Sequence, residues 1–472
     1  MTTYSRVGQA DIEHFVSVLG SSHVLVAEDE RNHYGHDETE DLVFLPEVVL
    51  KPGNTAQVSA VMSYCFEKNI PVTAAGGRTG LSGGALCVRG GILLSTERLN
   101  RIIEIDVDNL QLVTQPGVIT QVLQEAVEAH GLYYPPDPSS RGSCFIGGNL
   151  AENAGGPRAV KYGVTKDFVL DLEVVLANGA IIRTGARTLK NTTGYNLTQL
   201  MVGSEGTLGI ITEAVLKLVP APTAKLLMLI PFDSPTNACR AVSAIFRAGV
   251  VPSALEFMER DAIDFTLNYV DDVVLPVEAD VKAHLLVEVD GQYEDLLWRD
   301  CEKISENVAG FGAGEPLIAE DEAQKQQLWK LRRKVAEAVK SNSVYKEEDT
   351  VVPRYRLADL LEGVKRIGEN YGFKSVCYGH AGDGNLHVNI LRGNLSDDQW
   401  TNDLPRAITE IFELTVSLGG TLSGEHGIGW VQKEYMPIAF SETELDLMRS
   451  VKKIFDPHHI LNPGKLFPSQ TK

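Results

Sequence analysis

Residues 74–86 read AAGGRTGLSGGAL and form the first of four glycine-dense loops in the N-terminal half of the chain. The other three are residues 135–156 (PPDPSSRGSCFIGGNLAENAGG), 161–167 (KYGVTKD) and 203–209 (GSEGTLG). Glycine permits positive φ angles and lets backbone N–H groups approach an anion closely. Four such loops in one domain exceed what turns alone require, so their density indicates a large phosphate-bearing cofactor.

Three well-known motifs do not account for these loops. No G-x-G-x-x-G follows a strand and opens a helix, which argues against a Rossmann dinucleotide site. Gly80-x-Ser82-x-Gly84 matches the nucleophile elbow of serine hydrolases, but glycine turns flank it where that elbow needs a strand and a helix. The G-x-x-x-x-G-K-[ST] loop of P-loop nucleotide-binding proteins does not occur.

The segment around these loops, residues 43–219, alternates between strand and helix patterns. Short apolar runs bounded by Gly, Pro or Asn-Gly turns predict strands, at 48–54, 70–77, 91–95, 110–117, 171–182 and 208–220. Amphipathic patterns predict helices at 9–20, at 55–69 with Thr55 as N-cap, and at 120–131 with Gly131 as C-cap. Asn178-Gly179 is the strongest hairpin signal in the chain. We expect an α+β domain.

Pro220-Ala-Pro222 marks a domain boundary, beyond which the pattern changes. Longer predicted helices at 234–249, 323–340 and 356–372 separate predicted strands at 225–232, 283–291 and 375–380. This alternation indicates a second, α/β domain around one sheet. The expected division is therefore a first domain at 1–222, a second at 223–425, and a C-terminal segment at 426–472 that returns to the first domain.

The composition of the 472-residue chain excludes several classes of partner. A net charge of −20 argues against binding nucleic acid or an anionic membrane surface, because both need patches of Lys and Arg. An anionic substrate would need a local cationic pocket. The six cysteines are scattered without a Cys-x-x-Cys pair, so an iron–sulfur or cysteine-rich zinc site is not expected.

The N-terminus shows no basic segment followed by an apolar core, and no apolar run approaches the ~18 residues needed to span a bilayer. We therefore expect no signal peptide, no transmembrane segment and a cytoplasmic location. Scattered cysteines agree with a reducing compartment.

The C-terminal half carries a different signature, in YGHAGDGNLHVNI (378–390) and TLSGEHGIG (421–429). His380 and His387 are seven residues apart, but Ala381–Asn385 is a turn sequence, so a hairpin can bring both imidazoles to one face. With Glu425 from a distant loop they make two imidazoles and one carboxylate, the ligand set of an open catalytic metal site. We expect Zn²⁺, with Mn²⁺ or Fe²⁺ as alternatives. Ordinary hydrogen-bonded histidines are the competing interpretation.

His426 follows Glu425 directly, so it would lie near the same metal without being a ligand. Its ordinary pKa of ~6.5 suits a general base, and a hydrogen-bonding supporting role is the alternative. The segment LWKLRRKVAEAVK (328–340) is locally cationic in an acidic protein. On a helical wheel, Arg332 lies at the edge of the apolar stripe and Arg333 nearly opposite it, so Arg332 can reach inward and bind a carboxylate.

Together these motifs resemble the vanillyl-alcohol-oxidase/p-cresol-methylhydroxylase superfamily of flavoproteins. The matching residues of the first part are Gly76–Gly83, Ile146–Asn149 with Asn153-x-Gly155-Gly156, and Gly203–Ile210. GHAGDGNLH, GEHGIG and the closing Asn462–Lys465 (NPGK) are similar to its D-2-hydroxy-acid dehydrogenase branch. The resemblance implies a two-part FAD-binding domain and an α/β cap domain on one antiparallel sheet. A homodimer is compatible with it.

The same resemblance implies a noncovalent FAD, since the first loop holds no histidine that could tether the flavin. The first loop would wrap the pyrophosphate, the second loop would line the flavin, and Glu205 and Ile210 would lie on the adenosine side. The implied cofactor-binding residues are Gly76, Gly77, Arg78, Thr79, Gly80, Ser82, Pro136, Ser143, Gly147, Gly148, Asn149, Asn153, Gly155, Glu205, Ile210 and Asn462.

In that branch an Arg after Leu-Trp-x-x and a Lys after Tyr hold the substrate carboxylate. Arg332 and Lys346 match these positions. Asn389 lies two residues after His387, so we expect it to share the face of His387 and to be the third substrate-binding residue. The run Lys346-Glu-Glu-Asp349 is more acidic than in dehydrogenases of dicarboxylates, so a second carboxylate on the substrate is disfavoured.

The implied activity is oxidation of a D-2-hydroxy acid, D-lactate or glycolate, to the 2-keto acid, with His426 as base. Three alternatives stay open. They are oxidation of D-2-hydroxyglutarate or another alcohol, a non-catalytic flavoprotein subunit of a redox complex, and alkyl-ether chemistry on the same fold. A separate electron acceptor is expected, namely an electron-transfer flavoprotein, a quinone, a cytochrome or an iron–sulfur subunit.

Overall fold

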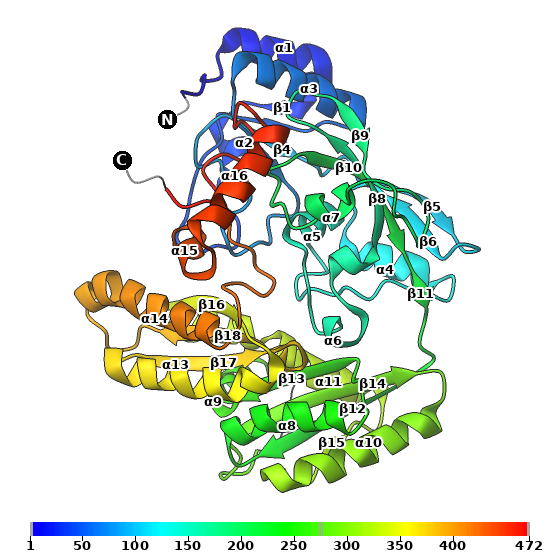
Figure 1. The fold of residues 1–472 in the computed structure, drawn as a ribbon, viewed down its shortest axis with the longest axis vertical. Helices are drawn as coiled ribbons and strands as arrows, with labels where there is room; N and C mark the ends of the chain where they lie inside the picture. The colour runs from blue at the N-terminus through cyan, green and yellow to red at the C-terminus, as the bar shows by residue number, and fades with distance from the viewer. Residues whose placement is uncertain (1–2, 272, 274, 276, 470–472) are drawn as a thin grey trace. The chain divides into compact units, whose positions relative to one another are not determined.

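The computed structural model describes residues 3–271, 273, 275 and 277–469, and the chain divides into two compact units (Figure 1). Unit 1 comprises Met1–Gly155, Val164–Ala221 and Glu425–Lys472, and unit 2 comprises Gly156–Gly163 and Pro222–Gly424. No sequence pattern predicted that Gly156–Gly163 belongs to unit 2. Arg158 in this segment forms a buried ion pair with Glu288, and Lys161 contacts Asp290, so charge pairing holds the segment on the sheet of unit 2.

Unit 1 contains two main sheets. The four-stranded sheet has the order β1-β2-β4-β3, with a parallel β2-β4-β3 core; its strands are β1 (Val24–Leu25), β2 (Val48–Leu50), β3 (Val72–Ala75) and β4 (Ile92–Ser95). The five-stranded antiparallel sheet has the order β5-β6-β10-β8-β9; its strands are β5 (Ile102–Asp106), β6 (Gln111–Thr114), β8 (Val169–Val175), β9 (Ile181–Arg183) and β10 (Ile210–Lys217). β7 (Leu132–Tyr133) pairs with β11 (Val219–Pro220).

The helices of unit 1 come from both ends of the chain. They are α1 (Gln9–Leu19), α2 (Glu28–Asn32), α3 (Thr55–Lys68), α4 (Thr120–Glu128), α5 (Ile146–Glu152), α7 (Leu197–Met201), α15 (Met436–Ala439) and α16 (Glu442–Phe455). A core cluster joins Phe15 of α1 and Met62 of α3 to the four-stranded sheet, and Ile460 and Leu461 of the C-terminal segment belong to the same cluster. Hydrophobic burial thus fixes the C-terminal segment to the N-terminal sheet.

Unit 2 is built on one seven-stranded sheet with the order β15-β12-β14-β13-β17-β18-β16, and all its pairings are antiparallel. The strands are β12 (Ala224–Phe232), β13 (Ala254–Glu259), β14 (Ala283–Gly291), β15 (Leu317–Ile318), β16 (Tyr345–Val351), β17 (Lys374–Gly379) and β18 (Asn385–Leu391). The expectation of an α/β domain on one antiparallel sheet is confirmed.

Helices cover both faces of this sheet. Consecutive residues of β13 and β18 are therefore all buried. The helices are α6 (Ala159–Tyr162), α8 (Pro235–Arg247), α9 (Arg260–Tyr269), α10 (Glu294–Val308), α11 (Glu322–Arg333), α12 (Val335–Asn342), α13 (Leu357–Tyr371) and α14 (Leu404–Ser417). α9, α11 and α12 share a core cluster with residues of one face, including Met258 and Tyr378. That face carries the polar residues considered below.

Three local expectations need correction. The N-cap of α3 is Asn54, whose side chain accepts the Gln57 N–H, rather than Thr55. The C-cap of α4 is Ala129, and Gly131 follows with a φ of 71°. The predicted helix 323–340 is two helices that meet at Lys334. By contrast, the Asn178-Gly179 hairpin is confirmed, since β8 and β9 pair across it and Gly179 has a φ of 84°.

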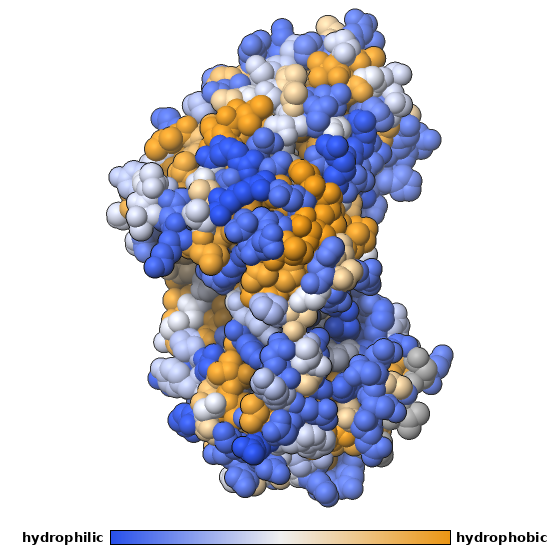
Figure 2. All heavy atoms as spheres, turned by 90° about the vertical axis from the view of Figure 1, so that its right-hand side faces the viewer, coloured by the Kyte–Doolittle hydropathy of each residue, from blue (hydrophilic) through white to orange (hydrophobic). Residues whose placement is uncertain are grey.

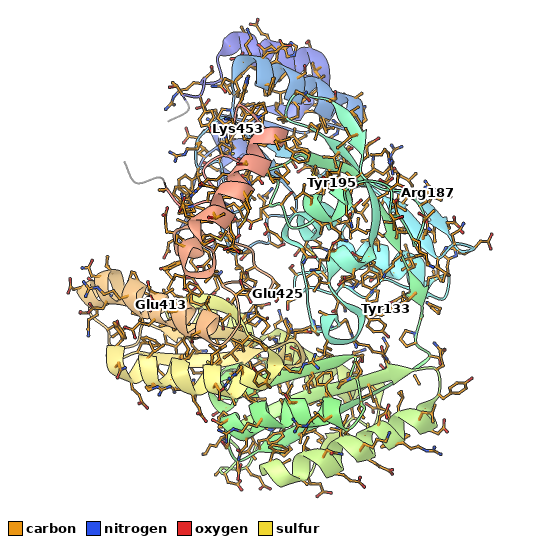
Figure 3. All side chains as sticks on the ribbon, viewed as in Figure 1. Tyr133, Arg187, Tyr195, Glu413, Glu425 and Lys453 are labelled. Atoms are coloured by element: carbon orange, nitrogen blue, oxygen red, sulfur yellow. The ribbon has the colours of Figure 1, made fainter. Side chains whose placement is uncertain are left out.

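The surface of unit 1 combines apolar and polar side chains. Figure 2 shows apolar side chains gathered on one face of unit 1, and the exposed apolar residues of this unit include Ile103 of β5 and Val122 of α4. Arg187 and Tyr195, labelled in Figure 3, lie in the loop between β9 and α7, which is exposed throughout residues 187–196. No described helix is long and apolar enough to cross a membrane.

Candidate active site

His380 begins the turn that joins β17 to β18, and His387 is the third residue of β18. The strands pair antiparallel with Tyr378 opposite His387, and a 3₁₀ turn at Ala381–Asp383 closes the hairpin. Both imidazoles are only 4% exposed, their ring centroids are 5.4 Å apart, and one ring nitrogen of each lies within 4.8 Å of the other. The prediction that a hairpin brings these two histidines together is confirmed.

Glu256 of β13 is the partner of His380. Both carboxylate oxygens lie 2.9 Å from His380 Nδ1, and Oε2 lies 2.7 Å from Arg332 Nη2. Burial alone would raise the pKa of Glu256, but His380 and Arg332 outweigh it and hold the pKa below its usual value. An ionised carboxylate can only accept hydrogen bonds, so Nδ1 carries the hydrogen and Nε2 presents its lone pair.

Asp349 of β16 lies opposite His387 and is almost fully buried. It accepts hydrogen bonds from Asn385 Nδ2 at 2.7 Å, Ser423 Oγ at 2.9 Å and the Gly424 N–H at 2.9 Å. His387 Nδ1 is 3.6 Å from Asp349 Oδ1 and 3.5 Å from Glu347 Oε1. These distances exceed ordinary hydrogen bonds, but the acidic flank still favours a hydrogen on Nδ1.

Arg332 lies on the same face of the sheet, at the C-terminal end of α11. It is 4% exposed, and its guanidinium stands 5.1 Å from the Tyr378 ring. Its Nε–H and Nη2–H groups make no hydrogen bond within the described part of the chain, although Nη2 is at ion-pair distance from Glu256. Buried guanidinium donors in this state are suited to an anionic ligand. Arg333, in contrast, is half-buried against Trp329.

Asn389 shares this face, two residues after His387, as predicted. It is fully buried, and neither amide atom has a well-formed hydrogen bond among the described residues. The Tyr378 hydroxyl is its polar neighbour, and burial raises the pKa of Tyr378 well above its usual value. A buried amide in this state is suited to a polar ligand.

The expectation that Lys346 binds the substrate carboxylate together with Arg332 does not agree with the register of β16. Lys346 pairs with Ile390, whereas Glu347 pairs with Asn389. Side chains alternate between the two faces of a strand. The Lys346 side chain therefore points away from the face that carries Asn389 and His387. The structure therefore does not bring Lys346 together with Arg332, and the residue that faces the site from this part of β16 is acidic.

Glu425 and His426 begin the last segment of unit 1 (Glu425 is labelled in Figure 3). A methyl group added to Gly155 would stand 3.0 Å from Glu425 Oε2, so Glu425 packs against the second glycine loop. Two and three residues beyond His426, the Ile428 and Gly429 N–H groups donate to the Glu205 carboxylate at 2.8 and 2.6 Å. Glu205 therefore holds the loop that carries the predicted base.

Glu205 belongs to a buried charged cluster with Glu152 and Lys465. Burial raises the pKa of both carboxyls, and for Glu152 the charge of Glu205 adds to this. Burial lowers the pKa of Lys465 to about 8. Lys465 Nζ donates to Gly84 O and Asn462 Oδ1, both at 2.6 Å. The cluster joins the first glycine loop, residue 205 and the C-terminal segment.

The glycine loops fit a cofactor by close backbone approach. A methyl group added to Gly77 would lie 2.6 Å from Ser143 O, and one added to Gly76 would lie 3.4 Å from Gly148 N. The first loop therefore packs directly on the second. A methyl group at Gly80 or Gly148 would meet no heavy atom within 4 Å, so open space borders both loops. Such a glycine-lined space suits a pyrophosphate and flavin.

Several implied cofactor residues have side chains that serve the fold instead. Ile210 is a core residue, so neither it nor Glu205 offers a side chain to an adenosine. Five other implied cofactor residues make contacts within the fold. Asn149 Nδ2 donates to Thr120 Oγ1, Asn153 Oδ1 accepts from the Lys166 N–H, and Asn462 Nδ2 donates to the Glu205 carbonyl. Ser143 Oγ donates to the Ser140 carbonyl, and the Arg78 guanidinium lies 4.5 Å from the centre of the Tyr34 ring.

The other implied cofactor residues remain compatible with the role. Gly147 packs on Pro116, and Pro136 is buried with its carbonyl bound by Gln124. Thr79 is half-buried beside Gly80. Ser82 Oγ is buried and has no hydrogen-bond partner among the described residues, although its carbonyl accepts the Trp430 N–H at 2.8 Å.

The donor set of unit 2 also fits a divalent cation. Glu256, Glu347 and Asp349 lie beside His380 and His387, and Arg332 opposes their charge. Such an excess of carboxylate is costly to bury unless a cation compensates it. Two Nε2 atoms and a carboxylate would satisfy zinc, manganese or ferrous iron.

The sequence did not single out Glu256, Asp349 or the role of Glu205. Glu256 carries a usable signal, because it is a charged residue in the centre of an otherwise apolar strand, ALEFME. Its partner His380 is 124 residues away, which no local pattern reveals.

Comparisons with known proteins agree with this architecture. A family model described as "FAD linked oxidases, C-terminal domain" matches residues 221–466, and one described as "FAD binding domain" matches residues 46–185. A glycolate oxidase subunit GlcD of Bacillus subtilis (strain 168) is 40% identical over 98% of this chain and 97% of its own. A D-lactate dehydrogenase of Anaerostipes hadrus is 37% identical over 98% of both chains.

The fold is also found among solved structures. That of p-cresol methylhydroxylase with substrate bound covers 98% of both chains with a TM-score of 0.78 at 17% identity, a likeness that concerns the fold alone. The glycine-lined loops of unit 1, the antiparallel sheet of unit 2 and the two family matches lead to one conclusion: this chain belongs to the family of FAD-linked oxidases.

Proposed function

We propose that the protein oxidises a short D-2-hydroxy acid, D-lactate or glycolate, to the 2-keto acid with FAD as hydride acceptor. The observation that carries this proposal is Arg332, a buried guanidinium with unused donors beside two imidazoles and the Asn389 amide. A planar guanidinium binds a carboxylate through two parallel hydrogen bonds. The similarity to a glycolate oxidase subunit and a D-lactate dehydrogenase supports the same class of substrate.

A divalent ion would be held by His380, His387 and Glu425. The Gly424 N–H is bound to Asp349, so one peptide bond separates Glu425 from a residue fixed on the histidine-bearing sheet. When bound, such an ion supplies a Lewis acid that lowers the pKa of a hydroxyl group, and FAD supplies the acceptor for the hydride.

In this proposal the protein's own residues bind and deprotonate the substrate. Arg332 holds the carboxylate, and Asn389 offers its amide to a substrate oxygen. His426 accepts the hydroxyl proton, because an imidazole is the side chain most often used as a general base near neutral pH. The open space along Gly80 and Gly148 would receive the pyrophosphate and flavin.

The charge of the site favours a monocarboxylate. The Lys346 side chain points to the face of the sheet away from the site, whereas Glu347 and Asp349 of β16 face the site. A second carboxylate on the substrate would meet these acids and be repelled. D-Malate and D-2-hydroxyglutarate should therefore be poor substrates.

The direct test is anaerobic bleaching of the purified yellow protein by a panel of acids. D-Lactate and glycolate should reduce the flavin, and L-lactate, D-malate and ethanol should do so at least about tenfold more slowly. A flavin that no 2-hydroxy acid bleaches would contradict the proposal and favour a non-catalytic subunit. Bleaching by simple alcohols alone would indicate a different alcohol oxidase.

A further inference from the structure

We propose that Glu256 and Asp349 are positioning residues of the metal site, which aim the Nε2 atoms of His380 and His387 at one ion and fix the chain next to Glu425. The inference deepens the proposed function and rests on its divalent ion. Neither residue would touch the ion or the substrate, so each would act through the group that it holds.

The case for Glu256 is a direct contact. Its two oxygens share the His380 Nδ1–H at 2.9 Å, which fixes both the tautomer and the ring plane. Metal-binding histidines commonly donate their other N–H to a carboxylate in this way, and loss of that partner weakens metal binding. Glu256 also lies 2.7 Å from Arg332 Nη2, so one carboxylate orients a metal ligand and the anion-binding guanidinium.

The case for Asp349 is its position between segments that are far apart in the chain. Its carboxylate accepts from Asn385, in the hairpin that carries His387, and from Ser423 and Gly424, immediately before Glu425. It also flanks His387 Nδ1 at 3.6 Å. A methyl group on Gly424 would stand 2.5 Å from Asn385 Nδ2, so the backbone there packs closely on the Asn385 side chain.

Each residue has a matched control on the other face of the same strand. Glu259 of β13 is buried on the face away from the site, where it forms an ion pair with Lys365 at 2.7 Å. Glu348 of β16 is buried, and it pairs with Val388 on the face opposite to His387. Removing either charge should disturb the sheet as much as removing Glu256 or Asp349, but should not affect the imidazoles.

The experiment measures zinc affinity in chelator-treated FAD-bound protein, by competition with a chromophoric chelator. Four variants, Glu256→Gln, Asp349→Asn, Glu259→Gln and Glu348→Gln, are compared with the wild type. We expect the dissociation constant for Zn²⁺ to rise about 10–100-fold in the first two variants and less than about threefold in the controls. Bound flavin and the melting temperature report whether each variant is folded.

Glu256→Asp separates position from charge and replaces Glu256→Gln if that variant does not fold. It keeps the negative charge but retracts the carboxylate by one methylene, so zinc affinity should still fall about tenfold. Unchanged affinity in the Glu256 and Asp349 variants would overturn the inference, as would equal losses in the controls. Failure of the wild type itself to bind Zn²⁺, Mn²⁺ or Fe²⁺ would remove the metal from the proposed function as well.

Discussion

The residues proposed for chemistry are held in two different ways. His387 lies within β18, in the backbone ladder with β17, and His380 directly follows β17 and accepts the backbone hydrogen bonds that close the hairpin turn; each imidazole is flanked by a carboxylate. Glu425 and His426 lie in an irregular loop, which depends on a few side-chain contacts such as that of Glu205. The two histidines of the hairpin are therefore each held by several contacts, whereas one substitution can displace the loop that carries Glu425 and His426.

The largest effect is expected at the loop, in His426→Ala. Loss of a general base should slow flavin reduction by D-lactate by ~10²–10⁴, while flavin stays bound. Anaerobic stopped-flow at a saturating acid concentration measures the rate. The flavin spectrum before mixing is the control. An unchanged rate would remove His426 from the role of base.

On the sheet side, Arg332→Lys should lower kcat/KM for D-lactate by on the order of 100-fold, mainly through KM. Lysine keeps the charge but loses the planar pair of donors, and hydrogen bonds to charged groups contribute about 1.5–3 kcal/mol. Arg333→Lys is the matched control, because Arg333 stacks on Trp329 away from the site. Steady-state kinetics of both variants decide the matter, and equal losses would argue against Arg332 as the anion-binding group.

The contrast also separates what sequence can and cannot predict. The turn between His380 and His387 and the apolar stripe around Arg332 follow from short-range patterns, so the hairpin and the inward arginine could both be predicted. Lys346 was assigned by likeness to a motif, but its face depends on the register between β16 and β18, which only the folded sheet defines. Glu205 and Glu256 act on partners 223 and 124 residues away, beyond any periodicity.

Glu205→Gln should loosen the loop and destabilise unit 1 by about 2–3 kcal/mol. Its carboxylate accepts two backbone N–H groups, and a glutamine offers one acceptor and turns an N–H group toward the other donor. Urea unfolding followed by flavin fluorescence measures the stability. Glu213→Gln, in a more exposed ion pair with Arg183, should cost less than about 1 kcal/mol. Equal costs would show that the loop does not depend on Glu205.

His284 shows what a buried imidazole on the same sheet does without a carboxylate. Burial, reinforced by Arg260, lowers the pKa of His284 to about 4, and its Nδ1 has no hydrogen-bond partner among the described residues. The folded state therefore binds its proton less readily than the unfolded state, so stability falls as the pH drops from 6.5 toward 4. Between pH 7 and 5 this group should cost about 2 kcal/mol.

The measurement is the pH dependence of unfolding in wild type and His284→Gln. The wild type should lose about 2 kcal/mol more than the variant between pH 7 and 5, with the difference vanishing above pH 7. Parallel pH profiles would mean that His284 is protonated normally in the folded protein.

The smallest effect is expected for Lys346→Ala. Because the Lys346 side chain points away from the site face of β16, kcat/KM for D-lactate should change by less than about threefold. Glu347→Ala, on the site face of the same strand, should produce the larger change. A loss of about 100-fold in Lys346→Ala would restore Lys346 as a substrate ligand and contradict the register of this strand.

The metal dependence of the reaction is measured by the rate of anaerobic flavin reduction by D-lactate before chelation, after removal of divalent ions, and after zinc is restored. The account predicts a fall of at least about 100-fold on chelation with flavin retained, and recovery when zinc, manganese or ferrous iron is added back. A rate that is indifferent to chelation would contradict it, and would leave His380 and His387 as structural residues of the sheet.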